Sequence, residues 1–155
     1  MKNEKFMQMA ISLSEENVFQ NKKQPFGAVV VKNGEVIGKA FNEVDKQNDP
    51  TAHAEIMAIR RACETVGSAQ LEGCELYTSA EPCPMCIGAI YWSQLEKVYF
   101  GNSKEDAKEA GFSDQFIYEE LDHPAEKRDL PMEQTMRDEA NGAFQEWCKQ
   151  QDDKD

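Results

Sequence analysis

Four side chains between residues 53 and 86 have the types and the spacing of a zinc site. His53 is followed two residues later by Glu55, and further along the chain Cys83 and Cys86 form a Cys-x-x-Cys pair directly after Pro82. Imidazole nitrogen and thiolate sulfur are preferred zinc ligands, and three protein ligands leave the fourth tetrahedral position open for water, as in catalytic zinc sites. We therefore expect one Zn²⁺ per chain, bound by His53, Cys83 and Cys86.

Glu55 has the chemistry that hydrolysis of an amine requires in addition to zinc. Bound Zn²⁺ can lower the pKa of a water molecule to about 7, but a second group must carry protons to the leaving nitrogen. Because Glu55 is two residues from His53, it can lie beside that water without binding the metal. A glutamate in a first helical turn is by itself explained by the helix dipole. Next to the three ligands, we interpret it as the catalytic acid and base.

Two non-hydrolytic interpretations use the same cysteines. A Cys-x-x-Cys pair at a strand-to-helix junction is also typical of dithiol redox proteins, and a zinc site can belong to a non-enzymatic interaction module. A structural zinc site needs a fourth ligand, but Cys63, Cys74 and Cys148 have no paired spacing. Neither interpretation gives Glu55 a role, so hydrolysis is favoured.

The local patterns place each of these residues where a helix begins. The segment "TAHAEIMAIRRACETVG" has apolar residues at helical intervals and ends in a glycine, which puts His53 and Glu55 at a helix N-terminus. The segment "CELYTSA" is typical of a buried strand, and "PMCIGAIYW" of a short helix with Pro84 in its first turn, followed by the strand "KVYFG". Both cysteines of the pair are therefore expected at a strand-to-helix junction.

The N-terminal half completes an α/β pattern. A helix is expected over about residues 4–20 with Asn3 as its N-cap, followed by two strands joined by Asn33-Gly34, and a polar stretch over residues 43–50 connects these to the zinc-site helix. Alternating strands and helices predict an α/β layered domain with the sheet in the middle. At 155 residues, the chain is expected to form one domain.

Beyond Gly101 the patterns weaken and the chain becomes acidic. We expect a short helix around residues 104–110, then an aromatic segment, a loop and an acidic helix near residues 132–150. The net charge is −12, and residues 101–155 hold 16 acidic and 7 basic side chains, giving −9. Since such a surface repels phosphate, nucleic acid is not expected as a partner. No apolar run suggests a membrane helix or secretory signal, so a cytoplasmic location, where thiols stay reduced, is expected.

The combination of motifs resembles the cytidine deaminase superfamily. An H-x-E sequence followed by P-C-x-x-C is the signature of its zinc site. The segments shared with the whole superfamily are "PFGAVVV", "NDPTAHAEIMAIR" and "EPCPMCIGAIYW". Within it, the chain is similar to the small bacterial guanine deaminases through "DAKEAGFSDQFIYEEL", "HPAEKRDLP" and "FQEW".

This resemblance implies a fold, an assembly and an activity. The fold would be a three-layer α/β/α arrangement with a mixed central sheet flanked by helices, in a single domain over residues 1–155. The assembly would be a homodimer in which C-terminal segments, about residues 101–155, are exchanged. The activity would be zinc-dependent hydrolytic deamination of guanine to xanthine and ammonia, a step of purine catabolism. The residues implied to contact the purine base are Phe26, Asn42, Ala54, Trp92 and Asp114.

The implied base-binding residues differ in role. Asn42 would hydrogen-bond the purine, and Phe26 and Trp92 would help form an aromatic wall, although either aromatic residue could equally belong to the core. Asp114, from the exchanged segment, could accept a hydrogen bond from the ring N–H of guanine that adenine lacks. A tRNA adenosine deaminase, or a deaminase of another amino-heterocycle such as cytosine or guanosine, remains the enzymatic alternative.

Overall fold

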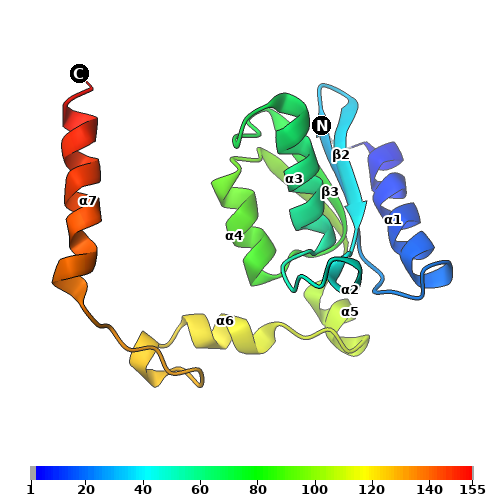
Figure 1. The fold of residues 1–155 in the computed structure, drawn as a ribbon. Helices are drawn as coiled ribbons and strands as arrows, with labels where there is room; N and C mark the ends of the chain where they lie inside the picture. Colours follow the sequence, from blue (N-terminus) through cyan, green and yellow to red (C-terminus); the bar gives the residue numbers. More distant parts are fainter. Residues whose placement is uncertain (1–2, 155) are drawn as a thin grey trace. The chain divides into compact units, whose positions relative to one another are not determined.

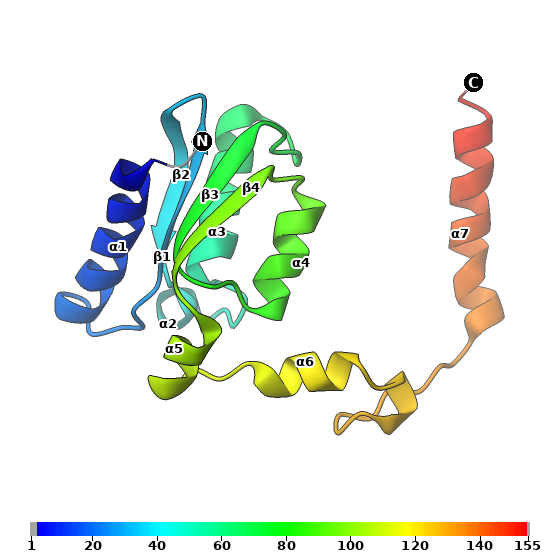
Figure 2. The same cartoon turned by 180° about the vertical axis from the view of Figure 1, so that it is seen from behind.

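The centre of the fold is a mixed sheet of four strands in the order β2-β1-β3-β4 (Figures 1 and 2). Its strands are β1 (Gly27–Lys32), β2 (Glu35–Phe41), β3 (Cys74–Ala80) and β4 (Lys97–Asn102). β1 pairs antiparallel with both β2 and β3, whereas β3 and β4 are parallel. All four strands lie where the sequence patterns predict them, and the parallel pair is joined through the helix that carries the two cysteines.

The connection between β1 and β2 is the predicted two-residue hairpin turn. Asn33 and Gly34 both have positive φ angles, 50° and 80°, as a type I′ turn requires. The register shifts between Val30 and Val31, two residues before the turn. This hairpin sets the antiparallel half of the sheet.

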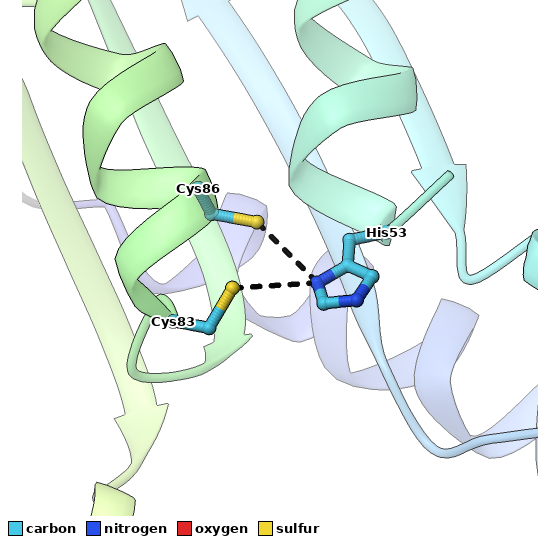
Figure 3. Close-up of side chains that lie close together, drawn as sticks. All are labelled: His53, Cys83 and Cys86. Carbon is cyan, nitrogen blue, oxygen red and sulfur yellow. Dashed lines mark hydrogen bonds between the residues drawn. The ribbon is translucent and has the colours of Figure 1, made fainter. Parts of the chain in front are cut away.

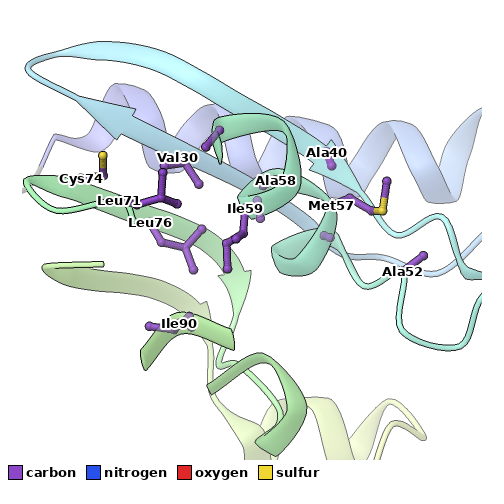
Figure 4. Close-up of a cluster of buried hydrophobic side chains, with 13 residues drawn as sticks. Val30, Ala40, Ala52, Met57, Ala58, Ile59, Leu71, Cys74, Leu76 and Ile90 are labelled. Carbon is purple, nitrogen blue, oxygen red and sulfur yellow. The ribbon is translucent and has the colours of Figure 1, made fainter. Parts of the chain in front are cut away.

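Helices cover both faces of the sheet (Figures 1 and 2). Helix α1 (Glu4–Phe19) packs on one face, and helices α3 (Ala54–Val66) and α4 (Pro84–Trp92) pack on the other. Because side chains alternate along a strand, Val29 packs with the α1 cluster and Val30 with the α3–α4 cluster, which Figure 4 shows. The predicted three-layer α/β/α fold with a mixed sheet is confirmed.

A glycine allows α3 to lie against β2 at backbone distance. A Cβ atom built on Gly38 would lie 2.6 Å from the amide nitrogen of Ala62 and closer still to the carbonyl oxygen of Ala58. Only a residue without a side chain fits between strand and helix here. Because α3 begins beside His53, this contact also fixes the distance between the sheet and the zinc site.

Two short helices flank the regular core. The polar stretch over residues 43–50 was expected as a connection, but it contains the one-turn helix α2 (Val44–Gln47), closed by Asn48 with a φ of 51°. The stretch has no apolar periodicity, so only the left-handed residue marks the turn. Helix α5 (Lys104–Glu109) was predicted, and a capping box between Ser103 and Asp106 begins it.

The structure describes residues 3–154, which divide into two compact units, one ending at Gln115 and the other beginning at Phe116. The end of β4 and the whole of α5 belong to the first unit, which therefore includes the first part of the C-terminal segment predicted over about residues 101–155. None of the helices in the described range is long and apolar enough to cross a membrane.

The second unit consists of helices without a core of their own. It contains most of α6 (Gln115–Leu121), a 3₁₀ turn (Ala125–Lys127) and α7 (Arg137–Asp152), and no described residue of these elements is buried. The final helix begins at Arg137 rather than near residue 132, because Met136 has a φ of 55°, which no α-helix accommodates. Its large apolar side chains, Phe144 and Trp147 among them, are exposed.

Candidate metal centre and base-binding site

Two helix N-termini bring the three predicted ligands together (Figure 3). His53 is the N-cap of α3, Cys83 is the N-cap of α4, and Cys86 lies in the first turn of α4. Pro84 occupies the first turn of α4, where its fixed φ favours the helix and its missing N–H costs no hydrogen bond. Free N–H groups at both N-termini stabilise negative charge, which favours thiolate over thiol.

The spacing of the ligand atoms fits a tetrahedral zinc ion. The Sγ atoms of Cys83 and Cys86 lie 3.5 Å and 3.6 Å from Nδ1 of His53. A tetrahedral Zn²⁺ with normal Zn–S and Zn–N bond lengths separates sulfur from nitrogen by about 3.5 Å. All three ligand atoms lie within 4.8 Å of one another, and no fourth His, Cys or acidic group of the described residues joins them. The geometry is that of a catalytic site with one open position.

The protonation of the ligands also favours a cation. A hydrogen bond from the Cys86 thiol and the neighbouring His53 imidazole lower the pKa of Cys83 to about 4. The same hydrogen bond and burial raise the pKa of Cys86. The lowered pKa of Cys83 favours its thiolate, the form that binds Zn²⁺, and zinc binding would displace the proton of Cys86.

Glu55 lies beside the ligands but is not one of them. Its side chain is buried, at 6% relative exposure, and it hydrogen-bonds with the Cys86 thiol. Burial raises the pKa of Glu55 above its ordinary value. A carboxyl group that both holds and releases a proton nearer neutrality is suited to general acid and base catalysis.

Asn42 is hydrogen-bonded to Phe26, whose ring packs against a second aromatic ring of the first unit. Its backbone N–H donates to the carbonyl of Phe26 at 3.0 Å, and its Oδ1 accepts from the N–H of Val44 at 3.1 Å. Among residues 3–154, none accepts a hydrogen bond from Nδ2 of Asn42, so this donor is available to a ligand. The ring of Phe26 meets that of Phe112 edge to face, with centroids 5.1 Å apart.

Phe112 was not singled out in the sequence. It follows Gly111, whose φ of 95° turns the chain after α5, and this turn brings the ring back to Phe26. The glycine before Phe112 could have indicated a turn at this point of the sequence, but it does not predict that the ring packs against Phe26.

Asp114 lies near the end of the first unit and within the segment, about residues 101–155, that is predicted to be exchanged. Burial raises the pKa of its carboxyl group, and the nearby Cys83 and Glu81 raise it further. The influence of Cys83 on this pKa places the two side chains near each other within the first unit. The role of Asp114 in binding the base from an exchanged segment stays a prediction.

Trp92 and Ala54 are placed very differently. Trp92 is 87% exposed at the C-terminal end of α4, whereas Cys83 is at its N-terminal end, about 13 Å away along a helix that rises 1.5 Å per residue. The structure does not bring Trp92 to the metal centre of its own chain. Ala54 is fully buried as the first residue of α3, directly between His53 and Glu55.

Residues 1–102 match the model of the cytidine and deoxycytidylate deaminase zinc-binding region, and this range contains all three ligands and Glu55. The chain belongs to this deaminase family. The resemblance inferred from the motifs is thereby confirmed, and His53, Cys83 and Cys86 form its zinc-binding triad.

Three comparisons extend over nearly the whole chain. A guanine deaminase of Bacillus subtilis (strain 168) is 50% identical over 147 residues, which cover 95% of this chain and 94% of that protein. The X-ray structure of guanine deaminase from Bacillus subtilis matches with a TM-score of 0.92 at 49% identity, covering 96% of this chain and 95% of that one. A tRNA-specific adenosine deaminase of Aquifex aeolicus is 39% identical over 149 residues, covering 96% of this chain and 95% of that protein.

Proposed function

We propose that this protein is a zinc-dependent guanine deaminase, which converts guanine and water to xanthine and ammonia. The observation that carries the substrate assignment is the 50% identity to a guanine deaminase over 95% of the chain, because the tRNA-specific adenosine deaminase that matches over a similar extent is 39% identical. The metal centre alone is shared by deaminases of several bases and does not choose among them.

Glu55 moves the protons of the reaction. Zinc held by the three ligands would supply a nucleophilic hydroxide near neutral pH. Glu55 takes the first proton that water loses and delivers it to the ring nitrogen next to the amine-bearing carbon, as the oxygen bonds to that carbon. It then takes the second proton from the newly attached hydroxyl group and delivers it to the amine, so that the C–N bond breaks, ammonia leaves and the base becomes xanthine. Its buried position and raised pKa suit both transfers.

The base is recognised by few polar groups against apolar walls. The free Nδ2 donor of Asn42 suits an acceptor on the purine, and the carboxylate of Asp114 suits N–H donors of guanine. Phe26 and its partner Phe112 supply aromatic surface for the purine ring, and Ala54 contacts it from between the zinc ligand and the catalytic glutamate. We leave Trp92 out of the pocket within one chain, since it lies at the far end of α4.

The active form is a homodimer in which the C-terminal segment, about residues 101–155, is exchanged between chains. The support is that the second unit, which lies within this segment, buries none of its described helical residues and exposes Phe116, Phe144 and Trp147, so it requires a further apolar surface. Mass measurement under native conditions should give twice the mass of the 17.6 kDa chain. A monomer at micromolar concentration would contradict the exchange.

The proposed location of the protein is the cytoplasm, where the Cys83 and Cys86 thiols stay reduced and can bind zinc.

Deamination of adenosine in tRNA is the second candidate, because a tRNA-specific adenosine deaminase is 39% identical over nearly the whole chain. Binding an RNA stem-loop requires clustered positive charge, and the charge of −9 over residues 101–155 opposes it.

Ammonia release by the zinc-loaded protein decides between these candidates. The panel contains guanine, guanosine, adenine, cytosine and a tRNA stem-loop at equal concentration. Turnover confined to guanine is expected. Inosine in the treated stem-loop with guanine unchanged would overturn the substrate assignment and leave the zinc chemistry in place.

A further inference from the structure

One buried polar side chain of the first unit has no part in the chemistry described so far. Asn17 lies in the last turn of α1 and is 1% exposed, whereas the other buried residues of this helix, Phe6 and Ala10, are apolar. Burial of an amide is unfavourable unless its polar atoms are hydrogen-bonded. The partners of Asn17 therefore indicate its role.

The carboxamide of Asn17 joins the two segments that carry base-binding residues. Its Nδ2 donates to the carbonyl of Gln24 at 2.7 Å and to the carbonyl of Asn42 at 3.1 Å. Its Oδ1 accepts from Nδ2 of Asn21 at 3.0 Å, which fixes the orientation of the amide. The carbonyl of Gln24 also accepts from the N–H of Phe26, whose own carbonyl accepts from the N–H of Asn42. One side chain thus closes a hydrogen-bonded ring that contains both segments.

We propose that Asn17 is a positioning residue for base recognition and acts through Asn42. This inference rests on the proposed function, in which Nδ2 of Asn42 binds the purine. Asn17 holds the carbonyl of Asn42, and the N–H groups of Asn42 and Val44 tie the same residue to Phe26 and to α2. The hydrogen bond from Asn17 to the carbonyl oxygen of Asn42 therefore restricts the backbone orientation of Asn42. The direction in which the free Nδ2 donor of Asn42 points depends on that orientation.

Few other side chains can take this position. An asparagine amide is a short side chain that can donate two hydrogen bonds and accept at least one, as Asn17 does here. Aspartate would place a carboxylate against two carbonyl oxygens, and an apolar residue would leave both carbonyls without this donor. Among the described residues, no other side chain donates to the carbonyl of Asn42.

A double-mutant cycle tests whether Asn17 acts through Asn42. The variants are Asn17→Ala, Asn42→Ala and the double variant, each loaded with zinc and assayed for kcat, KM and zinc content. Asn17→Ala should raise KM for guanine about tenfold and leave kcat within about twofold, because a contact made equally in ground and transition states affects KM alone. In the Asn42→Ala background the same substitution should change KM less than about twofold, since neighbours in one network are not additive. Zinc should stay at one per chain throughout.

Two results would overturn the proposal. In the first, the Asn17 and Asn42 effects multiply independently. In the second, KM is unchanged and only the amount of folded enzyme falls, which is what a purely structural role predicts. Ser14→Ala is the matched control, since Ser14 lies on α1 and its hydroxyl donates only to the Ile11 carbonyl, at 2.6 Å. It should change KM less than about twofold.

If Asn17→Ala does not fold, a second variant, Asn17→Ser, is used in its place. Asn17→Ser keeps one donor in a smaller side chain and enters the same cycle with a smaller expected rise in KM. The wild-type protein is assayed first, and the cycle uses the base that it deaminates. Failure on guanine would thus overturn the proposed substrate, whereas additivity on the accepted base would overturn the role of Asn17.

Discussion

The contact between β2 and α3 makes Gly38→Ala a test of how the zinc-site helix is placed. The added methyl group would meet the Ala62 amide nitrogen at 2.6 Å and the Ala62 Cβ at 3.0 Å, with the Ala58 carbonyl closer still. Normal contacts need about 3.5–4.0 Å, so α3 must move by roughly 1 Å. None of these atoms can rotate away, because each is backbone or Cβ.

The expected loss of stability follows from this overlap. Overpacking of this kind costs about 1–3 kcal/mol, and the smaller conformational entropy of the unfolded alanine chain offsets about 0.4–1 kcal/mol. We expect the free energy of unfolding to fall by about 1–2 kcal/mol and the Tm by about 2–8 °C. Urea unfolding of the zinc-loaded protein, followed by circular dichroism, measures it.

Gly88→Ala is the matched control with the opposite expected sign. Gly88 lies within α4, and a Cβ atom there would have no heavy atom within 4 Å apart from its own helix and chain neighbours. Alanine should raise the free energy of unfolding by about 0.5–1 kcal/mol, because glycine is a poor helix former. If Gly38→Ala left the urea midpoint unchanged or raised it as Gly88→Ala should, the close approach of α3 to β2 would be refuted.

Other substitutions test the site and its support. Glu55→Gln should keep one zinc per chain but lower kcat by about 10²–10⁴-fold, because proton transfer is lost; metal analysis and ammonia release check both, and near-normal turnover contradicts the mechanism. Asp114→Asn should raise KM for guanine about tenfold. Because burial raises the pKa of Asp114 above 3.8, the wild-type KM should rise as pH falls through that raised value and the carboxylate is lost, and a flat KM in acid would contradict its role. Arg61→Met should lower the free energy of unfolding by about 2 kcal/mol, since it leaves Glu43, 2.7 Å away, buried and without its cation. Arg60→Met, which breaks an exposed pair, should cost less than about 1 kcal/mol in the same urea titration, and equal losses would contradict this comparison.

The elements that hold the zinc ligands could be predicted because their signals are local. Gly67 ends α3 with a φ of 71°, as its position after the apolar pattern predicted, and Pro84 begins α4. Predicting ligands at such helix starts requires only that the two motifs, H-x-E and P-C-x-x-C, be recognised as parts of one site. The predicted start of α7 was wrong, because neither composition nor apolar periodicity indicates that Met136 adopts a left-handed conformation.

The proposed base-binding site was less predictable than the zinc site, because it depends on contacts between segments that are distant in the sequence. Asn17 meets the carbonyl of Asn42 across 25 positions of sequence, and Phe26 meets Phe112 from the other end of the first unit. Neither pair has a spacing that a periodic pattern could reveal. The role of Trp92 in an aromatic wall stays a prediction, since Trp92 shares α4 with Cys86 but lies about two and a half helical turns from Cys83.

The central claim is most directly tested by xanthine formation from guanine as a function of zinc occupancy. The metal-free protein is titrated with Zn²⁺ from zero to one ion per chain, and xanthine is measured at each step, with the Glu55→Gln variant in parallel. The rate should rise in proportion to bound zinc and level off at one ion per chain, and the Glu55→Gln variant should bind zinc equally but remain inactive. Guanine left unchanged at full zinc occupancy would contradict it.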